Sequence, residues 1–435
     1  MAKFLIKTLG CKVNQSESDS IYQSLKKKGF TEGSSNGNDL CLINTCAVTG
    51  KAAMQSRQAI RQIIRSNPDA KIIVSGCYAQ IEPEILKNIE GVHQVVSQSL
   101  KHKIDEVTSS YEFPNKFPSV LWDDILNQKN FEEIYGEPVS KRSRPFLKIQ
   151  DGCSSFCSYC VVPYTRGKNR SMPVENVLDH IQKLSLYGYK EIVLTGIHLG
   201  SYGKDIIPQT SFFELLQKIN NLALNIRIRL SSIEPMELTD DIIRLVVDSN
   251  IFCKHFHIPL QSGDDTVLQN MHRPYKASLF KDMVEFIHKL MPDACIGTDV
   301  LVGFPGETED AFNNTRKFIE ELPISYLHVF PFSFRPLVRA NNFEGKISED
   351  ILKKRASIIR KIGAIKKEKF LHSLIGKTYE TFIETKRDVS TGQLKGISTN
   401  YAKIFLKGDD IVKNSLIYVN ISNTFDKNFL IGKFI

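Results

Sequence analysis

The fold of this 435-residue chain is decided by residues 151–160, Asp-Gly-Cys-Ser-Ser-Phe-Cys-Ser-Tyr-Cys. The spacing of Cys153, Cys157 and Cys160 allows three thiolates to close around one face of an iron–sulfur cube. Four-iron clusters usually take four thiolates, so three leave one iron open to a small molecule. The alternative is structural zinc, which prefers two spaced cysteine pairs, and no second pair or histidine lies nearby. The stretch therefore predicts a reactive iron–sulfur site.

Composition predicts a cytoplasmic protein of two or three domains. No apolar run approaches the roughly 20 residues of a membrane span, and the apolar part of the N-terminus is too short for a secretory signal. We therefore expect no membrane partner. Nine cysteines in a reducing compartment are better candidates for metal or cluster binding than for disulfides.

Basic residues exceed acidic ones and gather at three places. The chain has 57 Lys+Arg against 48 Asp+Glu, a net charge of +9, which fits a polyanionic partner without requiring one. One run, 141–144, precedes the cysteine loop; Arg166, Lys168 and Arg170 follow it; and residues 353–369 are densely basic. A solvated surface is the alternative for each run.

Residues 1–98 predict an N-terminal domain with an open, mostly parallel α/β sheet. Cys11, Cys46 and Cys77 each follow one of its first three strands. Ligands of parallel sheets bind beyond the carboxyl ends of the strands, so these cysteines predict a second three-cysteine site, with coincidence as the alternative. Cys41, inside a strand, is expected to be a small buried hydrophobe. The predicted strands are 4–9, 40–44, 72–75 and 92–96, and the helices are 16–28 and 49–65.

Three further segments follow. Residues 99–138 read as a connector, 139–370 as a core of six strand–helix repeats with a basic C-terminal helix, and 371–435 as a small β-barrel. The core predicts a partial or complete parallel barrel, with the cysteine loop after its first strand. Its predicted strands are 146–150, 191–195, 226–232, 256–260, 295–302 and 326–332, and its helices are 174–187, 211–220, 239–249, 276–290, 308–321 and 348–370.

Around the cysteines the chain resembles the radical S-adenosylmethionine (SAM) enzymes, and within them the methylthiotransferases. The resemblance implies an N-terminal domain with an auxiliary 4Fe–4S cluster on Cys11, Cys46 and Cys77, a radical-SAM barrel and a C-terminal RNA-binding TRAM barrel. It also implies two SAM molecules per product, one as methyl donor and one as radical source. The motifs are 8–15 (TLGCKVNQ), 44–48 (NTCAV), 76–80 (GCYAQ), 163–167 (PYTRG), 194–200 (LTGIHLG), 229–235 (RLSSIEP), 257–263 (HIPLQSG), 297–308 (GTDVLVGFPGET) and 328–333 (HVFPFS).

The residues around Cys11 indicate which branch of this family the chain resembles. The run Gly-Cys-Lys-Val-Asn at 10–14, and His198, are similar to the branch that modifies N6-threonylcarbamoyladenosine beside the tRNA anticodon, at position 37. The isopentenyladenosine branch typically has Gly-Cys-Gln-Met-Asn, and the ribosomal-protein S12 branch Gly-Cys-Pro-Lys-Asn. The resemblance implies an anticodon stem-loop as partner, its phosphates meeting basic segments that include Arg166, Lys168 and Arg170. It also implies a sulfur source and an electron donor such as flavodoxin or ferredoxin.

Several strand-end residues are expected to contact SAM. Tyr159 is a candidate for the adenine pocket, with an ordinary packing role as the alternative. Three histidines, His255, His257 and His328, are expected to be hydrogen-bonded strand residues rather than metal ligands, and Cys253 and Cys295 to be structural. The other predicted SAM contacts are Thr195, Gly196, Ser231, Ser232, Glu234 and Gln261.

The sequence departs from the family pattern at two places, and it leaves two alternative functions open. Residues 337–340, Leu-Val-Arg-Ala, stand where the family usually has Gly-Thr-x-Ala, which leaves the substrate contacts of the 334–345 loop open. The tail from 376 matches the TRAM pattern only loosely. The rivals are a methylthiotransferase acting on isopentenyladenosine and a non-catalytic iron–sulfur protein that binds RNA.

Overall fold

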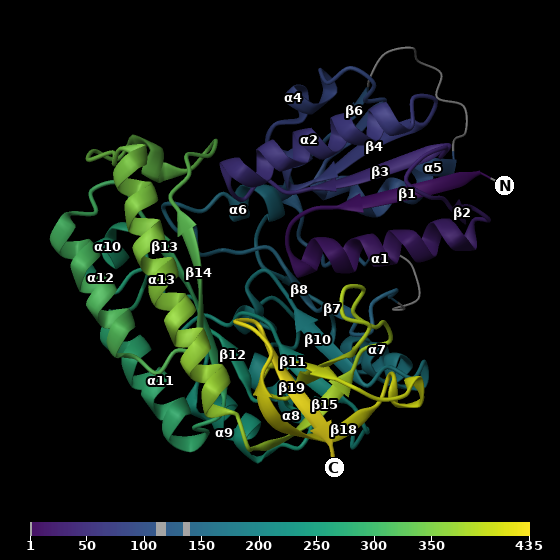
Figure 1. Cartoon of the computed structure of the whole chain (residues 1–435). Coiled ribbons are helices and arrows are strands. Elements are labelled where there is room, and N and C mark those ends of the chain that lie inside the picture. The colour runs from purple at the N-terminus through teal and green to yellow at the C-terminus, as the bar shows by residue number, and fades with distance from the viewer. Residues whose placement is uncertain (1, 110–118, 134–139) are drawn as a thin grey trace.

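The computed structural model describes residues 2–109, 119–133 and 140–435, which form three packed units (Figure 1). The N-terminal unit is a six-stranded parallel sheet in the order β2-β1-β3-β4-β5-β6. Its strands are β1 (Lys3–Thr8), β2 (Thr31–Glu32), β3 (Leu40–Thr45), β4 (Lys71–Gly76), β5 (Gln94–Val96) and β6 (Ser119–Leu121).

Helices cover both faces of this sheet. The α2 helix (Gly50–Ser66) packs Ala53 and Ile60 against Ile43 on one face. The α1 helix (Lys12–Lys27) packs Ile21 and Leu25 against the other. Shorter helices complete the unit: α3 (Cys77–Ile81), α4 (Pro83–Lys87), η1 (Gln98–Lys103), α5 (Ile104–Ser109) and η2 (Ile125–Asn127).

The N-terminal sheet continues past residue 98, the predicted end of the first domain. The β6 strand pairs in parallel with β5, and the Trp122 indole donates a hydrogen bond to the Gln80 carbonyl at 2.8 Å. Much of the predicted 99–138 connector is therefore part of the first unit. Its predicted end, between 138 and 139, falls outside the described residues.

The central unit is the partial parallel barrel that the sequence predicts. The six strands are β7 (Phe146–Lys148), β10 (Glu191–Thr195), β11 (Arg227–Leu230), β12 (His255–His257), β13 (Cys295–Val302) and β14 (Tyr326–Pro331). They form two three-stranded sheets, in the orders β11-β10-β7 and β12-β13-β14. Isolated parallel bridges, Ile228 to Phe252 and Ser232 to His257, join the two sheets.

Helices cover the outside of this barrel, and two of them begin as predicted. Ser211 forms a capping box with Glu214 at the start of α8, and the Thr308 side chain accepts from the Ala311 amide at the start of α12. The remaining elements are β8 (Gln150–Asp151), α6 (Val162–Arg166), β9 (Arg170–Ser171), α7 (Val174–Leu186), η3 (Leu199–Ser201), α8 (Phe212–Asn220), α9 (Asp240–Asp248), α10 (Asp265–Asn270), α11 (Ala277–Leu290), α12 (Glu309–Glu321), η4 (Arg339–Asn342) and α13 (Glu349–Ser373).

The C-terminal unit is the small closed β-barrel that the sequence predicts, in the order β15-β16-β17-β19-β18. It lies against the strand β11 (Figure 1). Among the described residues no helix has the length and apolar character needed to cross a membrane. The elements are β15 (Thr378–Ile383), β16 (Leu394–Ser398), β17 (Lys403–Leu406), η5 (Asp410–Val412), β18 (Leu416–Thr424) and β19 (Phe429–Phe434).

The turn between β16 and β17 closes the base of the central barrel. Arg227 donates to the carbonyls of Glu380 and Ile397 at 2.9 and 2.8 Å, and Arg229 donates to those of Ser398 and Thr399. The Tyr401 ring stacks on His255 at 4.3 Å between centroids and lies under the Arg229 guanidinium. Tyr401 has φ +66°, a conformation that bulky side chains seldom adopt, so these contacts hold it against backbone strain.

Replacing Tyr401 by alanine is expected to loosen the C-terminal barrel by about 1–3 kcal/mol, because one stacked pair and one cation–π contact are lost. Limited proteolysis should then release the C-terminal barrel faster than from the wild type. Tyr418→Ala is the matched control, since the Tyr418 side chain is 64 % exposed on the same barrel. Equal proteolysis of the two variants would show that Tyr401 does not hold the barrel in place.

Candidate active site

The loop with Cys153, Cys157 and Cys160 follows β8 at the top of the barrel. Gly152 begins it with φ +74°, and a Cβ there would come within 1.9 Å of the Lys168 carbonyl oxygen, so only glycine fits. The Cys153 amide donates to the Gly167 carbonyl at 2.9 Å, and the Cys160 amide to that of Cys157 at 3.0 Å. Burial raises the pKa of the Cys160 thiol, and the Cys157 and Cys153 thiols raise it further, so the three lie within electrostatic reach of one another.

Two side chains that the sequence analysis did not connect with this loop contact its thiols. Cys153 Sγ lies 3.4 Å from His198 Nδ1, and His198 Nε2 lies 2.9 Å from a Glu237 carboxylate oxygen. Burial alone would lower the pKa of His198, but these two partners outweigh it and raise the value to about 10. On the other side Arg273 donates to Cys157 Sγ at 3.4 Å and pairs with Glu234. The loop therefore has one cationic neighbour on each flank.

The structure brings Cys11, Cys46 and Cys77 together at one edge of the N-terminal sheet. Cys11 precedes α1, Cys46 follows β3, and Cys77 opens α3 directly after β4. Gly10 has φ +94°, and a Cβ there would lie 2.9 Å from Cys46 Sγ, so glycine leaves room beside that thiol. Burial and the neighbouring Cys77 thiol raise the pKa of Cys46 to about 12.

Both sets of thiols fit a four-iron cluster by their chemistry. Each offers three sulfur donors on separate backbone positions, and burial disfavours the free thiolate of Cys46 and Cys160, a cost that a bound metal would offset. When bound, a cluster at either set would keep one iron without a protein ligand, open to SAM or to sulfur. The assignment of each cysteine as a ligand stays a prediction. Cys41, Cys253 and Cys295 are buried elsewhere.

The predicted SAM contacts lie in different surroundings. Thr195 and Ser231 are buried at the ends of β10 and β11, and Ser231 Oγ has no hydrogen-bond partner within the described part of the chain, which suits a ligand contact. Gly196 packs against Gln150, where a Cβ would come within 2.9 Å of Gln150 Oε1. Tyr159 packs beside the buried cluster around Phe304 and Phe332.

The other three predicted SAM contacts are exposed, already paired, or fixed by backbone hydrogen bonds. Ser232 is exposed, and the Glu234 carboxylate is already paired with Arg273. Gln261 has φ +66° and its backbone bonds to β13, through the Asp299 carbonyl at 2.8 Å and the Leu301 amide at 2.9 Å. These hydrogen bonds fix the position of the Gln261 backbone relative to β13.

Two of the three predicted RNA contacts are corrected by the structure. Arg166 is 0 % exposed and Arg170 is 3 % exposed, so neither guanidinium reaches a phosphate on the surface. Arg170 donates to the Arg166 carbonyl at 2.7 Å. Only Lys168 is exposed, and it remains a predicted RNA contact.

Arg166 instead joins the two cysteine sites. Its Nε donates to Cys77 Sγ at 3.4 Å, and its Nη1 lies 3.2 Å from an Asp151 oxygen, two residues before Cys153. The same guanidinium pairs with Glu17 at 2.6 Å. Lys101 and Lys148 also pair with Glu17, at 2.6 and 3.3 Å. This ion network holds the N-terminal sheet against the cysteine loop.

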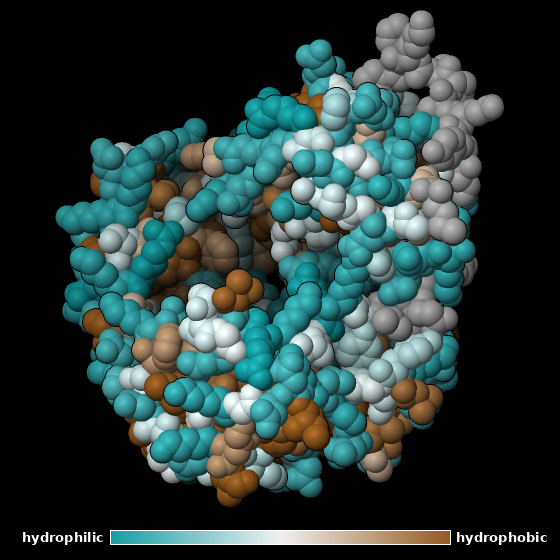
Figure 2. Space-filling model, turned by 45° about the vertical axis from the view of Figure 1, so that its right-hand side comes forward, coloured by the Kyte–Doolittle hydropathy of each residue, from teal (hydrophilic) through white to brown (hydrophobic). Residues whose placement is uncertain are grey.

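The divergent loop after β14 also joins the two sites. The Gly50 amide donates to Ser333 Oγ at 2.8 Å, and Arg335 donates to the Ala47 carbonyl, next to Cys46, at 2.9 Å. Further along, the Ala340 amide donates to the Ser158 carbonyl at 2.8 Å, inside the cysteine loop. Figure 2 shows a hollow between the N-terminal unit and the barrel with apolar atoms on its inner wall.

The strand histidines are hydrogen-bonded, as predicted. His255 Nε2 and His257 Nδ1 each lie 3.0 Å from the Tyr326 hydroxyl. One Asp299 oxygen lies 2.9 Å from His257 Nε2 and 3.2 Å from His328 Nδ1. His257, Asp299 and His328 also offer ligand atoms within 4.8 Å of one another, but mutual hydrogen bonds account for that arrangement.

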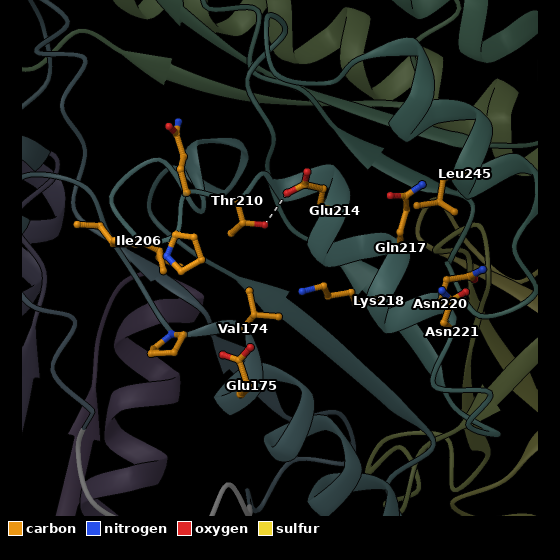
Figure 3. A pocket seen from close by; sticks show the side chains of 14 residues that line it. Val174, Glu175, Ile206, Thr210, Glu214, Gln217, Lys218, Asn220, Asn221 and Leu245 are labelled. Atoms are coloured by element: carbon orange, nitrogen blue, oxygen red, sulfur yellow. Dashed lines mark hydrogen bonds between the residues drawn. The ribbon is translucent and has the colours of Figure 1, made fainter.

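A separate pocket lies on the helical outside of the barrel (Figure 3). It is lined by the start of α7, the loop at 206–210 and α8, and the Thr210 hydroxyl donates to Glu214 at 2.7 Å within it. None of the cysteines or predicted SAM contacts lines this pocket, so we do not assign it to the active site.

The fold and the cysteine loop assign this chain to the class of radical-SAM enzymes. Residues 147–319 match the Radical SAM superfamily. The radical SAM methyltransferase TsrM of Kitasatospora setae has a similar fold, with a TM-score of 0.55 at 12 % identity over 76 % of this chain and 73 % of that one. Residues 3–97 match a family described as "Uncharacterized protein family UPF0004".

Relatives with similar sequences narrow this class to the tRNA methylthiotransferases. The chain is 37 % identical to the threonylcarbamoyladenosine tRNA methylthiotransferase MtaB of Bacillus subtilis, over 97 % of this chain and 94 % of that protein. It is 37 % identical to MtaB of Aquifex aeolicus over 88 % of this chain and 92 % of that protein. A tRNA-2-methylthio-N(6)-dimethylallyladenosine synthase of Clostridium botulinum is 32 % identical over 97 % and 94 %. The chain belongs to the radical-SAM tRNA methylthiotransferase family, in its MtaB-type branch. SAM and 4Fe–4S clusters are the cofactors of that family.

Proposed function

We propose that this protein adds a methylthio group to carbon 2 of N6-threonylcarbamoyladenosine at tRNA position 37, with SAM as methyl donor and radical source. The observation that carries the proposal is the position of Arg166. One buried guanidinium contacts both Cys77 and Asp151, two residues before Cys153, so the two three-cysteine sites lie close together. An enzyme that both activates a carbon and delivers sulfur to it needs the two sites to share one substrate base.

The chain's own residues divide the work. Cys153, Cys157 and Cys160 would hold the radical-SAM cluster, and Cys11, Cys46 and Cys77 the auxiliary one. Thr195 and Ser231, buried at strand ends, are the best placed of the predicted SAM contacts. Tyr159, Gly196, Ser232, Glu234 and Gln261 remain candidates, Glu234 acting through its pair with Arg273.

Partners and location extend this proposal. Lys168 is exposed beside the cysteine loop and would contact the phosphates of the anticodon stem-loop. A low-potential donor such as flavodoxin or ferredoxin would supply the electron, and a separate sulfur source would replenish the transferred sulfur. The net charge of +9 favours a tRNA partner, and that partner would place the protein in the cytoplasm.

A strain that lacks this gene is expected to lose 2-methylthio-N6-threonylcarbamoyladenosine from its tRNA while keeping the unmethylthiolated nucleoside. Mass spectrometry of digested tRNA measures both nucleosides. Complementation with the wild-type gene should restore the product. A version with Cys157→Ala should not, because that substitution removes one thiol of the radical site.

The second candidate is methylthiolation of isopentenyladenosine, which the 32 % identical synthase of Clostridium botulinum favours. The same mass spectra decide between the two. Loss of methylthiolated isopentenyladenosine, with the threonylcarbamoyl product intact, would assign the protein to that branch. Purified enzyme that forms no 5′-deoxyadenosine with SAM, reductant and tRNA would instead favour a non-catalytic binder.

A further inference from the structure

One face of β14 carries a row of three aromatic side chains. Tyr326, His328 and Phe330 alternate along the strand, so all three project from the same face. The Tyr326 ring centroid lies 5.4 Å from that of His328, and the His328 centroid lies 6.5 Å from that of Phe330. Gly297 on the neighbouring strand β13 leaves room for this row, because a Cβ there would come within 2.0 Å of the Tyr326 ring.

The row is held in place at one end and exposed at the other. The Tyr326 hydroxyl lies 3.0 Å from His257 Nδ1 inside the barrel. His328 Nδ1 lies 3.2 Å from an Asp299 oxygen. Exposure then rises along the strand, since the His328 side chain is 56 % exposed and Phe330 is 41 % exposed. Two exposed rings that are already ordered can bind a flat ligand at little cost in side-chain entropy.

The exposed end of the row leads to the N-terminal unit. Ser333, three residues after Phe330, accepts a hydrogen bond from the first amide of α2 at 2.8 Å. Arg335 donates to the carbonyl of Ala47, directly after Cys46, at 2.9 Å. Three residues of chain span at most about 10 Å. Phe330 therefore lies near the segment that carries one of the three-cysteine sites.

The opposite face of β14 is covered by α13, whose exposed side is basic. Figure 1 shows α13 running along β14, and Gly363 allows the close approach, since a Cβ there would come within 3.1 Å of the Leu327 side chain. Arg360 is exposed and reaches the edge of the strand, with its Nη2 3.5 Å from the Val329 carbonyl oxygen. The exposed charged side chains between residues 353 and 365 are all cations: Lys353, Lys354, Arg360 and Lys361.

Exposed aromatic rings beside a group of cations are the features with which proteins bind single-stranded nucleic acid. The rings stack on unpaired bases, and the cations contact the phosphates of the same strand. A duplex stem offers only phosphates to such a surface, because its bases already stack on one another. An anticodon loop offers unpaired bases and phosphates together. The surface formed by β14 and α13 therefore fits the loop of an RNA hairpin better than its stem.

We propose that Phe330, supported by His328, stacks on an unpaired nucleobase next to the target adenosine in the anticodon loop, and that Arg360 contacts a phosphate of the same strand. This inference rests on the proposed function for the identity of the RNA. A neighbouring base that stacks on Phe330 no longer stacks on the target base. The target base is then free to leave the loop and reach the cysteine sites.

The test is the binding of labelled anticodon stem-loops to the cluster-loaded enzyme under anaerobic conditions, measured by fluorescence anisotropy. One stem-loop is intact, and in each of two others one of the nucleotides beside position 37 lacks its base. Phe330→Ala should weaken binding of the intact loop about 10-fold, the loss expected for one stacked base, and Phe330→Trp should retain the affinity. With the loop that lacks the stacked base, wild type and Phe330→Ala should agree within about twofold.

The salt dependence separates stacking from charge. Arg360→Gln should reduce the slope of log affinity against log salt concentration by about 1, because one phosphate contact is lost. Phe330→Ala should leave this slope unchanged. Leu279→Ala is the matched control for the loss of an exposed apolar side chain, since Leu279 is 42 % exposed on α11. It should leave the affinity for every loop unchanged.

The outcomes distinguish this inference from the function on which it rests. If wild type and Phe330→Ala bind the intact loop equally well, the inference is wrong and the proposed function stands. The inference is also wrong if Phe330→Ala weakens the intact loop and both base-lacking loops equally, because the ring then contacts neither neighbouring base. Wild-type enzyme that binds neither these loops nor full-length tRNA would overturn the inference and the proposed function together.

Discussion

Cys11→Ala is expected to abolish methylthiolation of tRNA while SAM is still cleaved to 5′-deoxyadenosine. Cys11 belongs to the set at the edge of the N-terminal sheet, and the loop at 153–160 keeps its three thiols in the variant. We expect the methylthiolated nucleoside to fall at least about 100-fold and 5′-deoxyadenosine to change by less than about fivefold, since only one of two separable sites is lost. Mass spectrometry of both products from one anaerobic reaction measures the split.

Two further variants make this result decisive. Cys157→Ala should lose both products, because it removes a thiol from the radical site. Cys41→Ala should keep both, because Cys41 is buried inside β3 and belongs to neither set. If Cys11→Ala also lost 5′-deoxyadenosine, the two sites would not divide the chemistry as proposed.

The convergence of Cys46 and Cys77 was predictable for a topological reason. Cys46 and Cys77 follow consecutive neighbours in a parallel sheet, and Thr45 pairs with Gly76 in the register between β3 and β4. Sequence alone places such loops at one edge once the strands are assigned. The barrel strands were found for a different reason, since short strand patterns alternate regularly with helical patterns along this part of the chain.

The elements that the sequence did not predict correctly, β6 and the start of α1, have physical explanations as well. The β6 strand has three residues and follows a segment rich in proline and polar side chains, so neither length nor periodicity marks it. The α1 helix begins at Lys12, four residues before its predicted start. The sequence does not mark this start, because Cys11 provides no side-chain cap and no acidic residue lies in the first turn. The polar motif around Cys11 therefore looks like a loop.

Long-range pairing is what sequence reasoning could not supply. Arg166 was predicted to meet RNA because a basic residue after a cysteine loop looks exposed, yet its main partner Glu17 lies 149 positions away. Arg273 was missed although it contacts Cys157, because 116 residues separate the two. A local pattern does not reveal whether an arginine is paired, whereas its burial in the fold does.

Glu17→Gln is expected to destabilise the junction between the N-terminal sheet and the barrel by about 3 kcal/mol at neutral pH. The Glu17 carboxylate is 2 % exposed and pairs with Arg166, Lys101 and Lys148. Its removal leaves those cations without their shared counter-charge, although Arg166 keeps its contact with Asp151. The midpoint of urea unfolding should therefore fall. Glu84→Gln is the matched control, since its pair with Lys87 is exposed and contributes at most about 1 kcal/mol.

The pH dependence identifies the charge as the cause. Burial would raise the pKa of Glu17, but Arg166, Lys101 and Lys148 outweigh it and hold the value well below its usual range. Because the pKa of Glu17 is lower in the folded than in the unfolded state, its carboxylate stabilises the fold fully at a pH above the unfolded-state pKa, about 4.3 for a glutamate. This stabilisation is lost as the pH falls through the folded-state pKa. The difference between wild type and Glu17→Gln should therefore be constant from about pH 8 to 6 and shrink below about pH 5. Cluster-free protein serves for this series, because the comparison needs the ion network and not the iron. A difference that stays constant down to pH 3 would mean that Glu17 acts through packing, and that the charge network does not align the two cysteine sites.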